Sequence, residues 1–228
     1  MIGVVIPAHN EEALIGPCLE SIATAARCPR LQGEAVWVIV VCDHCTDGTL
    51  GVARQLMAQT LELSARNVGQ ARAAGAELAL RAGARWLAFT DADTLVSPQW
   101  LSEQLALDAD AVCGTIGVAH WSGYGQRMSQ HFTLTYTDAD GHRHIHGANL
   151  GVSAQAYVRA GGFGALASGE DVALVAGLQR SGARIAWSAR PRVSTSARSD
   201  FRAPGGFGAT LSRIERERSW ADQMPLAA

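Results

Sequence analysis

Short apolar runs alternate with amphipathic stretches along the first half of the chain. Two runs, at residues 2–7 and 35–42, are continuous and rich in β-branched side chains, and weaker runs follow at 61–65, 86–91 and 111–118. Runs of this length are typical of strands that are covered on both faces. Because helical patterns separate them over the first ~110 residues, the sequence predicts a parallel sheet with right-handed crossovers.

Four helices are expected between these strands. The first, over residues 10–26, contains Pro17, which predicts a late start or a kink. The last, over residues 97–107, is expected to have Ser97 as its N-cap and Pro98 at its first helical position. The two helices between them are expected over residues 46–59 and 69–83.

The pattern changes after residue 110. Residues 131–147 read as two strands joined by an Asp140-Gly141 turn, which is a β-hairpin signal. We expect one α/β domain over residues 1–228, in which a mostly parallel sheet carries helices on both faces and a small antiparallel hairpin lies in the C-terminal half. The remaining elements are expected to be helices over 153–162, 169–182 and 209–220 and a strand over 184–189.

Length and composition exclude several classes of protein. The formal net charge of the 228 residues is −2, which argues against a general nucleic-acid-binding protein. No apolar run approaches the length of about 18 residues that a membrane span needs, and the first residues lack the pattern of a signal peptide. The five cysteines form no secreted framework, so we expect reduced thiols and a cytoplasmic location.

Polar residues gather where three of the predicted strands end, at 7–12, 42–49 and 91–94. The carboxyl ends of neighbouring strands in an open α/β sheet are where ligands bind. Asp91 and Asp93, one residue apart, suit a hard divalent cation such as Mg²⁺ or Mn²⁺ that is shared with a diphosphate. The alternative is that this pair only forms a turn before the helix at Pro98.

Six motifs in this order resemble the family 2 glycosyltransferases, inverting enzymes of the GT-A fold that use nucleotide-diphospho-sugar donors. The resemblance covers roughly residues 2–190. Each motif is weak alone, but the set and its order are specific. The motifs are PAHNEE at 7–12, VVCDHCTDGT at 40–49, NVGQARAAG at 67–75, FTDADT at 89–94, GANLGVSAQAYVRAGGF at 147–163 and GEDVAL at 169–174.

The resemblance implies a role for each matching residue. Asp43 would accept a hydrogen bond from the base, which suits the N3–H of uracil, and Arg72 would meet the base or a phosphate. Asp93 would bind the metal directly and Asp171 would be the general base. The implied donor site includes Pro7, Ala8, Glu11, Asp43, Asn67, Gly69, Arg72 and Asp91; the metal site includes Asp91 and Asp93; the catalytic pair is Asp171 with Glu170, which is oriented toward the acceptor.

Three further groups are candidates from their residue types or position. Arg198 and Arg202 lie in a Gly/Ser/Pro-rich segment after the E-D motif, and arginine suits paired contacts with phosphate. His146, Gly147 and Asn149 lead into the acceptor-side segment. Many GT-A enzymes place a metal-binding histidine after the E-D motif, but this chain has none beyond His146. The metal is then left with Asp93, the diphosphate and water, or with His146 as a substitute ligand.

Two other patterns have ordinary explanations. Cys42 and Cys45 have the C-x-x-C spacing of a zinc or redox site, but the chain offers no second pair of ligands, so we interpret Cys42 as a strand residue and Cys45 as a loop thiol. His142 and His144 alternate with His146 on one face of a strand, and a solvated face is favoured over a metal site.

The sequence therefore predicts a glycosyltransferase that moves one sugar, from a UDP-sugar, to an acceptor hydroxyl with inversion. Residues 1–110 would form the nucleotide-binding half and 111–228 the acceptor and catalytic half. The Q-x-x-R-W motif of processive synthases is absent, which disfavours polymer synthesis. The alternatives are a sugar-phosphate nucleotidyltransferase, whose usual basic Gly-rich loop after strand one is missing, and a non-catalytic nucleotide-sugar-binding protein, which would not need Asp171. The acceptor stays open between a small molecule, a lipid-linked intermediate and a protein.

Overall fold

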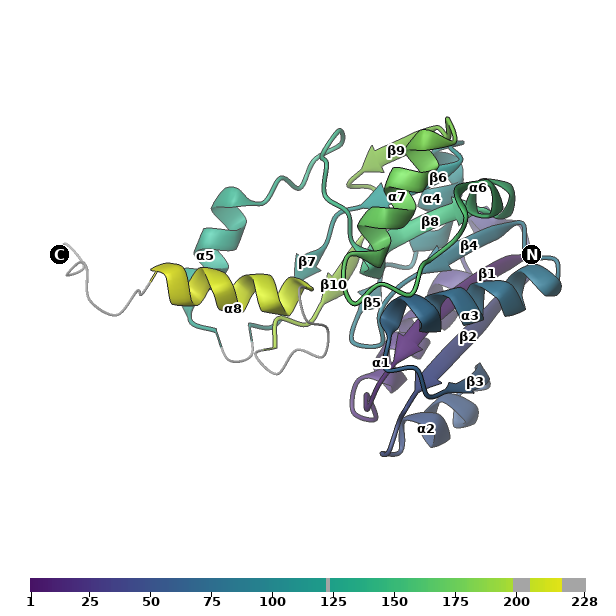
Figure 1. The fold of residues 1–228 in the computed structure, drawn as a ribbon, viewed down its shortest axis with the longest axis horizontal. Coiled ribbons are helices and arrows are strands. Elements are labelled where there is room, and N and C mark those ends of the chain that lie inside the picture. Colours follow the sequence, from purple (N-terminus) through teal and green to yellow (C-terminus); the bar gives the residue numbers. More distant parts are fainter. Residues whose placement is uncertain (122–123, 199–205, 219–228) are drawn as a thin grey trace.

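The computed structural model describes residues 1–121, 124–198 and 206–218, and its centre is a seven-stranded sheet of order β3-β2-β1-β4-β8-β6-β9 (Figure 1). Strand β8 runs antiparallel to both of its neighbours, and all other neighbouring strands run parallel. The predicted fold class, a mostly parallel α/β sheet, is confirmed. The strands are β1 Ile2–Ala8, β2 Val36–Asp43, β3 Gln59–Leu63, β4 Trp86–Phe89, β6 Ala111–Gly114, β8 Leu150–Ser153 and β9 Ile185–Ser188.

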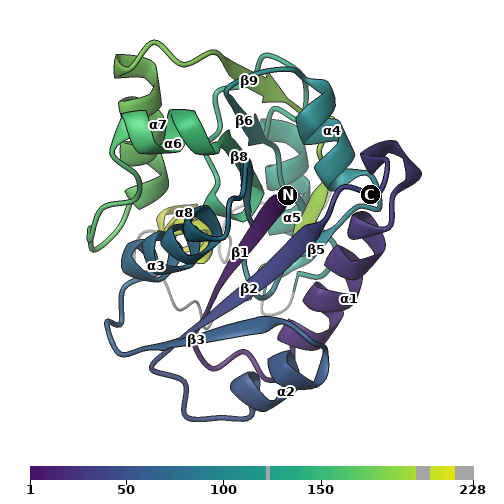
Figure 2. The ribbon, with the colours of Figure 1, turned by 90° about the vertical axis from the view of Figure 1, so that its right-hand side faces the viewer.

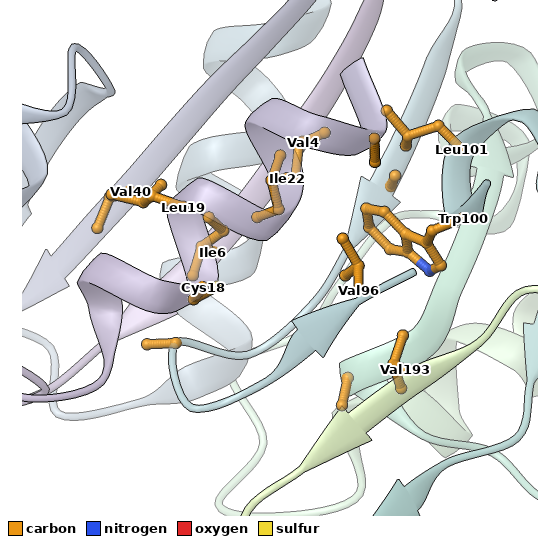
Figure 3. Close-up of a cluster of buried hydrophobic side chains, with 14 of the residues drawn as sticks. Val4, Ile6, Cys18, Leu19, Ile22, Val40, Val96, Trp100, Leu101 and Val193 are labelled. Atoms are coloured by element: carbon orange, nitrogen blue, oxygen red, sulfur yellow. The ribbon is translucent and has the colours of Figure 1, made fainter. Parts of the chain in front are cut away.

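Helices cover both faces of this sheet (Figure 2). Side chains of β1 alternate between the two faces, so that Val4 and Ile6 belong to one apolar cluster and Val5 to the other. Figure 3 shows the first cluster, where Ile22 of α1 and Trp100 of α4 pack on the sheet. On this face lie α1 Ile15–Ala26, α2 Thr49–Gln55, the short 3₁₀ helix Pro29–Leu31 and α4 Trp100–Ala106; on the other lie α3 Val68–Arg81, α6 Ala154–Ala160 and α7 Glu170–Arg180.

A close approach of α3 to the sheet depends on one glycine. A Cβ atom at Gly75 would come within 2.5 Å of Val5 and 3.0 Å of Val41, so a larger residue would push the helix outward. The small residues of α3 thus let the helix lie directly on β1 and β2. This contact fixes the distance between α3 and the sheet. The N-terminal end of α3 lies at the candidate site.

A second sheet has three strands in the order β5-β10-β7 and lies beside the main sheet. In Figure 1, helices α5 and α8 lie on the side of the second sheet that is away from the main sheet. Met128 of α5 and Leu211 of α8 share a small apolar cluster with Tyr124 and Ala197. These elements are β5 Leu95–Val96, β7 Gly117–Val118, β10 Val193–Thr195, α5 Gln126–Thr135 and α8 Phe207–Arg218. In the described ranges, no helix combines the length and apolar character needed to cross a membrane.

The hairpin predicted over residues 131–147 is wrong. Its first half completes α5, because Met128, Phe132 and Tyr136 recur every four residues, and the rings of Phe132 and Tyr136 stack at 4.5 Å. The turn at Asp140 does form, but its carboxylate accepts hydrogen bonds from Ser188 and from the amide of Ala189. The turn therefore docks against the end of β9 and closes no hairpin.

Two other boundaries differ from the sequence prediction or refine it. Helix α1 begins at Ile15, so Pro17 lies in its first turn and the predicted late start is confirmed. Helix α4 begins at Trp100, and Ser97 is not its N-cap. Instead, the Ser97 amide donates to Arg192 O at 2.9 Å and its carbonyl accepts from Trp100 N at 3.0 Å, which ties this turn to the second sheet.

Candidate active site

The polar segments that follow β1, β2 and β4 meet, as predicted from their positions at the strand ends. The amide of Glu11 donates to Thr49 Oγ1 at 2.8 Å, and the amide of Glu12 donates to Asp47 Oδ2 at 3.1 Å. Cys18 Sγ donates to Asp91 O at 3.4 Å, which joins α1 to the segment after β4. All five cysteines are free, and Cys42 is buried in β2.

Asp43 at the end of β2 organises the loop that precedes α3. Its Oδ1 accepts from the amides of Ala65 and Arg66 at 2.7 and 2.9 Å, and its Oδ2 accepts from the amide of Asn67 at 2.7 Å. Asn67 is in turn the N-cap of α3, since its Oδ1 accepts from Gln70 N. The buried carboxylate thus holds the loop in one conformation, a structural task that the resemblance did not imply.

Two histidines that sequence reasoning missed lie at the same edge. The rings of His9 and His44 are almost parallel, with an interplanar angle of 11° and centroids 6.3 Å apart. His9 Nδ1 donates to the carbonyl of Asp43 at 2.7 Å, and His44 Nε2 contacts the guanidinium of Arg66. The available signal was position, because each histidine directly follows a strand that carries predicted site residues.

Arg72 is buried between two carboxylates. Its Nη2 donates to Asp91 Oδ1 and its Nη1 donates to Glu170 Oε1. Burial acts to lower the pKa of Arg72, but Asp91, Glu170 and Asp171 raise it above its ordinary value. The Arg72–Glu170 pair is buried on both sides, and removing one partner of such a pair costs about 3–5 kcal/mol of stability. Both terminal nitrogens contact carboxylates here, and the implied contact of Arg72 with a base or a phosphate stays a prediction.

Asp93 lies beside a second arginine. Its side chain is 16% exposed, and Arg198 Nη2 is 3.6 Å from its Oδ2. The same guanidinium donates to both carboxylate oxygens of Glu11, with Nη1 2.8 Å from Oε2. Burial and the charge of Asp91 raise the pKa of Asp93 to about 6, although Arg198 opposes the shift. Arg202 lies outside the described residues.

The site carries an excess of negative charge. Five carboxylates lie around the two guanidinium groups of Arg72 and Arg198, which leaves a formal excess of three negative charges. In the described part of the chain, no group of three or more histidine, cysteine or acidic residues could hold a metal ion. A cation that takes one or two carboxylates and completes its shell with phosphate and water fits this arrangement, as Mg²⁺ commonly does. The five carboxylates are those of Glu11, Asp91, Asp93, Glu170 and Asp171.

Asp171 stands in the first turn of α7. Its Oδ2 accepts from the amide of Gly147 at 2.8 Å and its Oδ1 from the amide of Val172 at 2.8 Å. The neighbouring Glu170 is buried; burial raises its pKa, while Arg72 acts to lower it. The two acids of the E-D motif therefore have different surroundings, with Glu170 inside the ion-pair network and Asp171 at its edge.

Asn67 and Gly69, predicted as donor residues, join α3 to the loop before α7. Asn67 Nδ2 donates to Leu166 O at 2.8 Å. A Cβ atom at Gly69 would lie 2.3 Å from Gly164 O, so the position requires glycine. Pro7 and Ala8 end β1, where they pair with Val41 and Cys42 of β2.

The acceptor-side assignment of Asn149 does not fit the structure. Asn149 is buried, its Nδ2 donates to Thr115 O at 2.7 Å and to Pro191 O at 2.8 Å, and its Oδ1 accepts from Trp100 Nε1 at 2.8 Å. Both amide hydrogens are used and the residue is 1% exposed, so the side chain links α4 to the segments after β6 and β9 and is closed to an acceptor.

The three alternating histidines form a stack, and the solvated face predicted for His142 and His144 is wrong. Ring centroids are 5.5 Å apart between His142 and His144 and 5.9 Å apart between His144 and His146. His142 is only 3% exposed, and His144 stacks on Tyr136 at 4.2 Å. Tyr136, which follows the last residue of α5, packs against His144 and His146, a contact that the sequence did not predict.

His146 is held as a neutral ring. The Tyr136 hydroxyl accepts from Ile116 N at 2.9 Å and forms a hydrogen bond with His146 Nε2 at 3.0 Å. Burial and the neighbouring His144 and His142 lower the pKa of His146 to about 3. Burial raises the pKa of Tyr136 to about 12, so both groups stay neutral at physiological pH.

Acid should therefore destabilise the fold through His146. The pKa of His146 is about 3 in the folded state and near 6.5 in the unfolded state. Below pH 6.5 the unfolded chain therefore binds a proton that the folded protein does not, and stability falls as the pH falls. Between pH 6.5 and about 3, we expect this residue alone to lower the free energy of unfolding by up to about 1.4 kcal/mol per pH unit. Urea unfolding at pH 7, 6 and 5 should show a shallower dependence for His146→Gln, but not for the exposed control His120→Gln. Equal slopes for wild type and His146→Gln would contradict the assignment.

The chain matches the model of Glycosyl transferase family 2 over residues 3–160. No curated protein matched the sequence. Among solved structures, S. aureus TarS 1–349 in complex with UDP-GlcNAc superposes with a TM-score of 0.69 at 15% identity, over 98% of this chain and 68% of that one. The UDP complex of TarS 1–349 is covered to 60% of its length, so the chain spans about two thirds of this relative or less.

Two further structures share the fold. The mannosyltransferase PcManGT from Pyrobaculum calidifontis, in complex with GDP-Man and Mn²⁺, has a TM-score of 0.65 at 19% identity, over 98% of this chain and 65% of that one. Glucosyl-3-phosphoglycerate synthase from Mycobacterium tuberculosis, in complex with phosphoglyceric acid, has a TM-score of 0.58 at 19% identity, over 86% and 71%. The family model covers more than half of the chain, so the chain belongs to glycosyl transferase family 2, and its fold is the GT-A fold.

Proposed function

We propose that this protein transfers a single sugar from a UDP-sugar to an acceptor hydroxyl, with inversion at the anomeric carbon. The observation that carries the proposal is the meeting of Asp91, Asp93 and Asp171 at one edge of the sheet, in a site with excess negative charge. TarS in complex with UDP-GlcNAc and PcManGT in complex with GDP-Man supply the precedents for such a donor on this fold.

Asp93 is the proposed protein ligand of a divalent cation, with Asp91 beside it. A bound Mg²⁺ or Mn²⁺ would supply Lewis-acid stabilisation of the charge that grows on the leaving diphosphate. PcManGT in complex with GDP-Man and Mn²⁺ supports this choice of metal. In the described residues, no group of three or more possible protein ligands surrounds Asp93. This agrees with a cation whose other ligands are oxygen atoms of the donor diphosphate and of water.

Asp171 is the proposed general base. Its Oδ2 is fixed by the amide of Gly147, which leaves the carboxylate oriented and partly exposed at the start of α7. An acceptor hydroxyl is a poor nucleophile and must lose its proton as it attacks. Direct attack on the face opposite the leaving diphosphate inverts the anomeric configuration. Glu170 is held by Arg72, so it supports the position of Asp171 and takes no proton in this scheme.

Arg198 is the proposed protein contact of the diphosphate. It is the counter-ion of Glu11 and Asp93 in the described structure, on the same side of the site as the proposed metal ligand. A guanidinium group binds phosphate oxygens as readily as carboxylates. We infer that Arg198 exchanges part of its carboxylate contact for the diphosphate when the donor binds.

Asp43→Ala should weaken nucleotide binding, because the loop at 65–67 loses the three amide contacts that hold it. A charge-assisted hydrogen bond is worth about 1.5–3 kcal/mol, so we expect at least a tenfold loss of UDP affinity. Calorimetry with UDP and Mn²⁺ measures this, with Asp108→Ala as a control because Asp108 is 97% exposed. A change of less than twofold in Asp43→Ala would mean that neither Asp43 nor its loop touches the nucleotide.

A thermal-shift panel tests the function. The panel compares UDP-, GDP- and dTDP-sugars, each with and without Mn²⁺. A ligand at 100 times its Kd stabilises the folded state by about 2.7 kcal/mol, which raises the melting temperature of a domain of this size by about 5–10 °C. We expect a UDP-sugar with Mn²⁺ to give the largest shift. If a GDP-sugar gives the largest shift, the donor nucleotide is guanosine diphosphate instead of uridine diphosphate. If no donor gives a shift, the proposal is overturned.

A further inference from the structure

Arg72 links three segments that are far apart in the sequence. From α3 it reaches Asp91 after β4 and Glu170 at the start of α7, and its guanidinium carbon lies 5.8 Å from the centre of the Phe163 ring. The Arg72 and Glu170 side chains are 4% and 7% exposed, so the contact between them is shielded from water and salt, while Asp91 is 35% exposed. The arrangement fixes the start of α7 relative to the end of β4.

Gly147 packs against the guanidinium group of Arg72. A Cβ atom built at this position would lie 2.4–2.6 Å from Nη2, Cζ and Nη1 of Arg72, which no side chain tolerates without displacement. The backbone of Gly147 therefore rests directly against Arg72. The same residue donates its amide hydrogen to Asp171 Oδ2 at 2.8 Å.

Arg72 can affect the position of Asp171 through two sets of contacts. Arg72 holds Glu170, the residue before Asp171, and it also supports Gly147, whose amide orients the Asp171 carboxylate. Both terminal nitrogens contact carboxylates and the side chain is 4% exposed, so in this conformation the guanidinium faces the two acids.

We propose that Arg72 is a positioning residue for the Asp171 carboxylate and that Gly147 is the contact through which it acts. The inference rests on the proposed function, in which Asp171 is the general base. Displacing Gly147 would tilt the carboxylate away from the acceptor hydroxyl while leaving the nucleotide loops at Glu11 and Asp43 in place. The predicted signature is a loss of turnover without a matching loss of donor affinity.

The chain offers a matched control for each variant. Gly147→Ala is compared with Gly51→Ala, since a Cβ atom at Gly51 meets nothing within 4 Å. Arg72→Lys is compared with Arg81→Lys on the same helix, because Arg81 forms an exposed ion pair with Glu77. Release of UDP from UDP-GlcNAc with Mn²⁺ gives kcat and KM, calorimetry gives UDP affinity, and NMR gives the hydrogen-exchange rate of the amide at residue 147.

Gly147→Ala and Arg72→Lys should each lower kcat by at least 30-fold, change UDP affinity by less than threefold, and speed exchange of the amide at residue 147 by at least tenfold. Lysine lacks the planar group that a Cβ atom at 147 would meet, so the double variant should lose less than the product of the two single losses. The controls should leave all three quantities within twofold.

Two results would overturn the inference. If kcat stays within threefold, Arg72 does not position the base; if UDP affinity falls as much as kcat, Arg72 contacts the donor. A wild-type protein that neither binds UDP nor releases it from UDP-GlcNAc would count against the proposed donor. In that case the exchange rate at residue 147 still decides whether Arg72 and Gly147 hold the Asp171 carboxylate.

Discussion

Asp171→Asn is expected to lower turnover by about 10²–10⁴-fold, the usual contribution of a general base, with melting temperature and UDP affinity nearly unchanged. Asparagine keeps the size of the side chain, and its oxygen can still accept from Gly147 N, but it takes no proton from an acceptor hydroxyl. Turnover is measured as release of nucleoside diphosphate, with slow hydrolysis of the donor by water in place of transfer to an acceptor.

The control for this prediction is Asp108→Asn, at an almost fully exposed acid that pairs with Arg184. An Asp171→Asn protein that keeps more than about a tenth of wild-type turnover would move the base elsewhere. Glu170 is engaged by Arg72, and His146 Nε2 is occupied by the Tyr136 hydroxyl, so both alternatives require these contacts to break. A non-catalytic nucleotide-sugar-binding protein would show no turnover in wild type either.

Asp93→Ala should abolish the metal dependence of donor binding. We expect Mn²⁺ to raise the UDP affinity of wild type by at least tenfold, about 1.4 kcal/mol, because the cation joins Asp93 to the diphosphate. In the variant the affinities with and without Mn²⁺ should be equal, since Asp91 is already paired with Arg72.

Calorimetric titrations of both proteins with UDP, in Mn²⁺ and in chelator, measure this difference. Asp108→Ala is the control and should keep the full dependence. If wild-type affinity does not depend on Mn²⁺ or Mg²⁺, the metal assignment of Asp93 fails. In that case Arg198, the proposed contact of the diphosphate, would be left as its counter-ion, although it already pairs with Glu11 and Asp93.

The strand pattern predicted the parallel core because each buried strand is apolar on both faces. Val4 and Ile6 belong to one apolar cluster and Val5 to the other, so both faces of β1 are covered. The alternation of polar and apolar residues gave a wrong prediction where contacts with other side chains decide the secondary structure. Residues 131–135 alternate in polarity like a strand, yet they form a helix because Phe132 stacks on Tyr136 one turn away. The antiparallel strand β8, which completes the sheet between β4 and β6, was also not predicted.

The site was predictable in its location and less so in its contacts. The positions of Asp91, Asp93 and Asp171 after a strand or at the start of a helix are local properties that motifs report. The partner of a buried charge is not, because Arg72 and Glu170 are 98 residues apart in sequence. The same holds for Asn149, whose motif position suggested an acceptor contact while its hydrogen bonds join distant segments of the core.

The stereochemistry of the transferred sugar tests the central claim most directly. Proton NMR, recorded during turnover of an α-linked UDP-sugar with Mn²⁺, follows the anomeric signal of the released or transferred sugar before it equilibrates. Direct displacement by a hydroxyl that Asp171 deprotonates predicts a β-configured first product, formed together with UDP and about 10²–10⁴-fold more slowly by Asp171→Asn. A first product that keeps the α configuration, or the same β product at an undiminished rate from Asp171→Asn, would contradict the account.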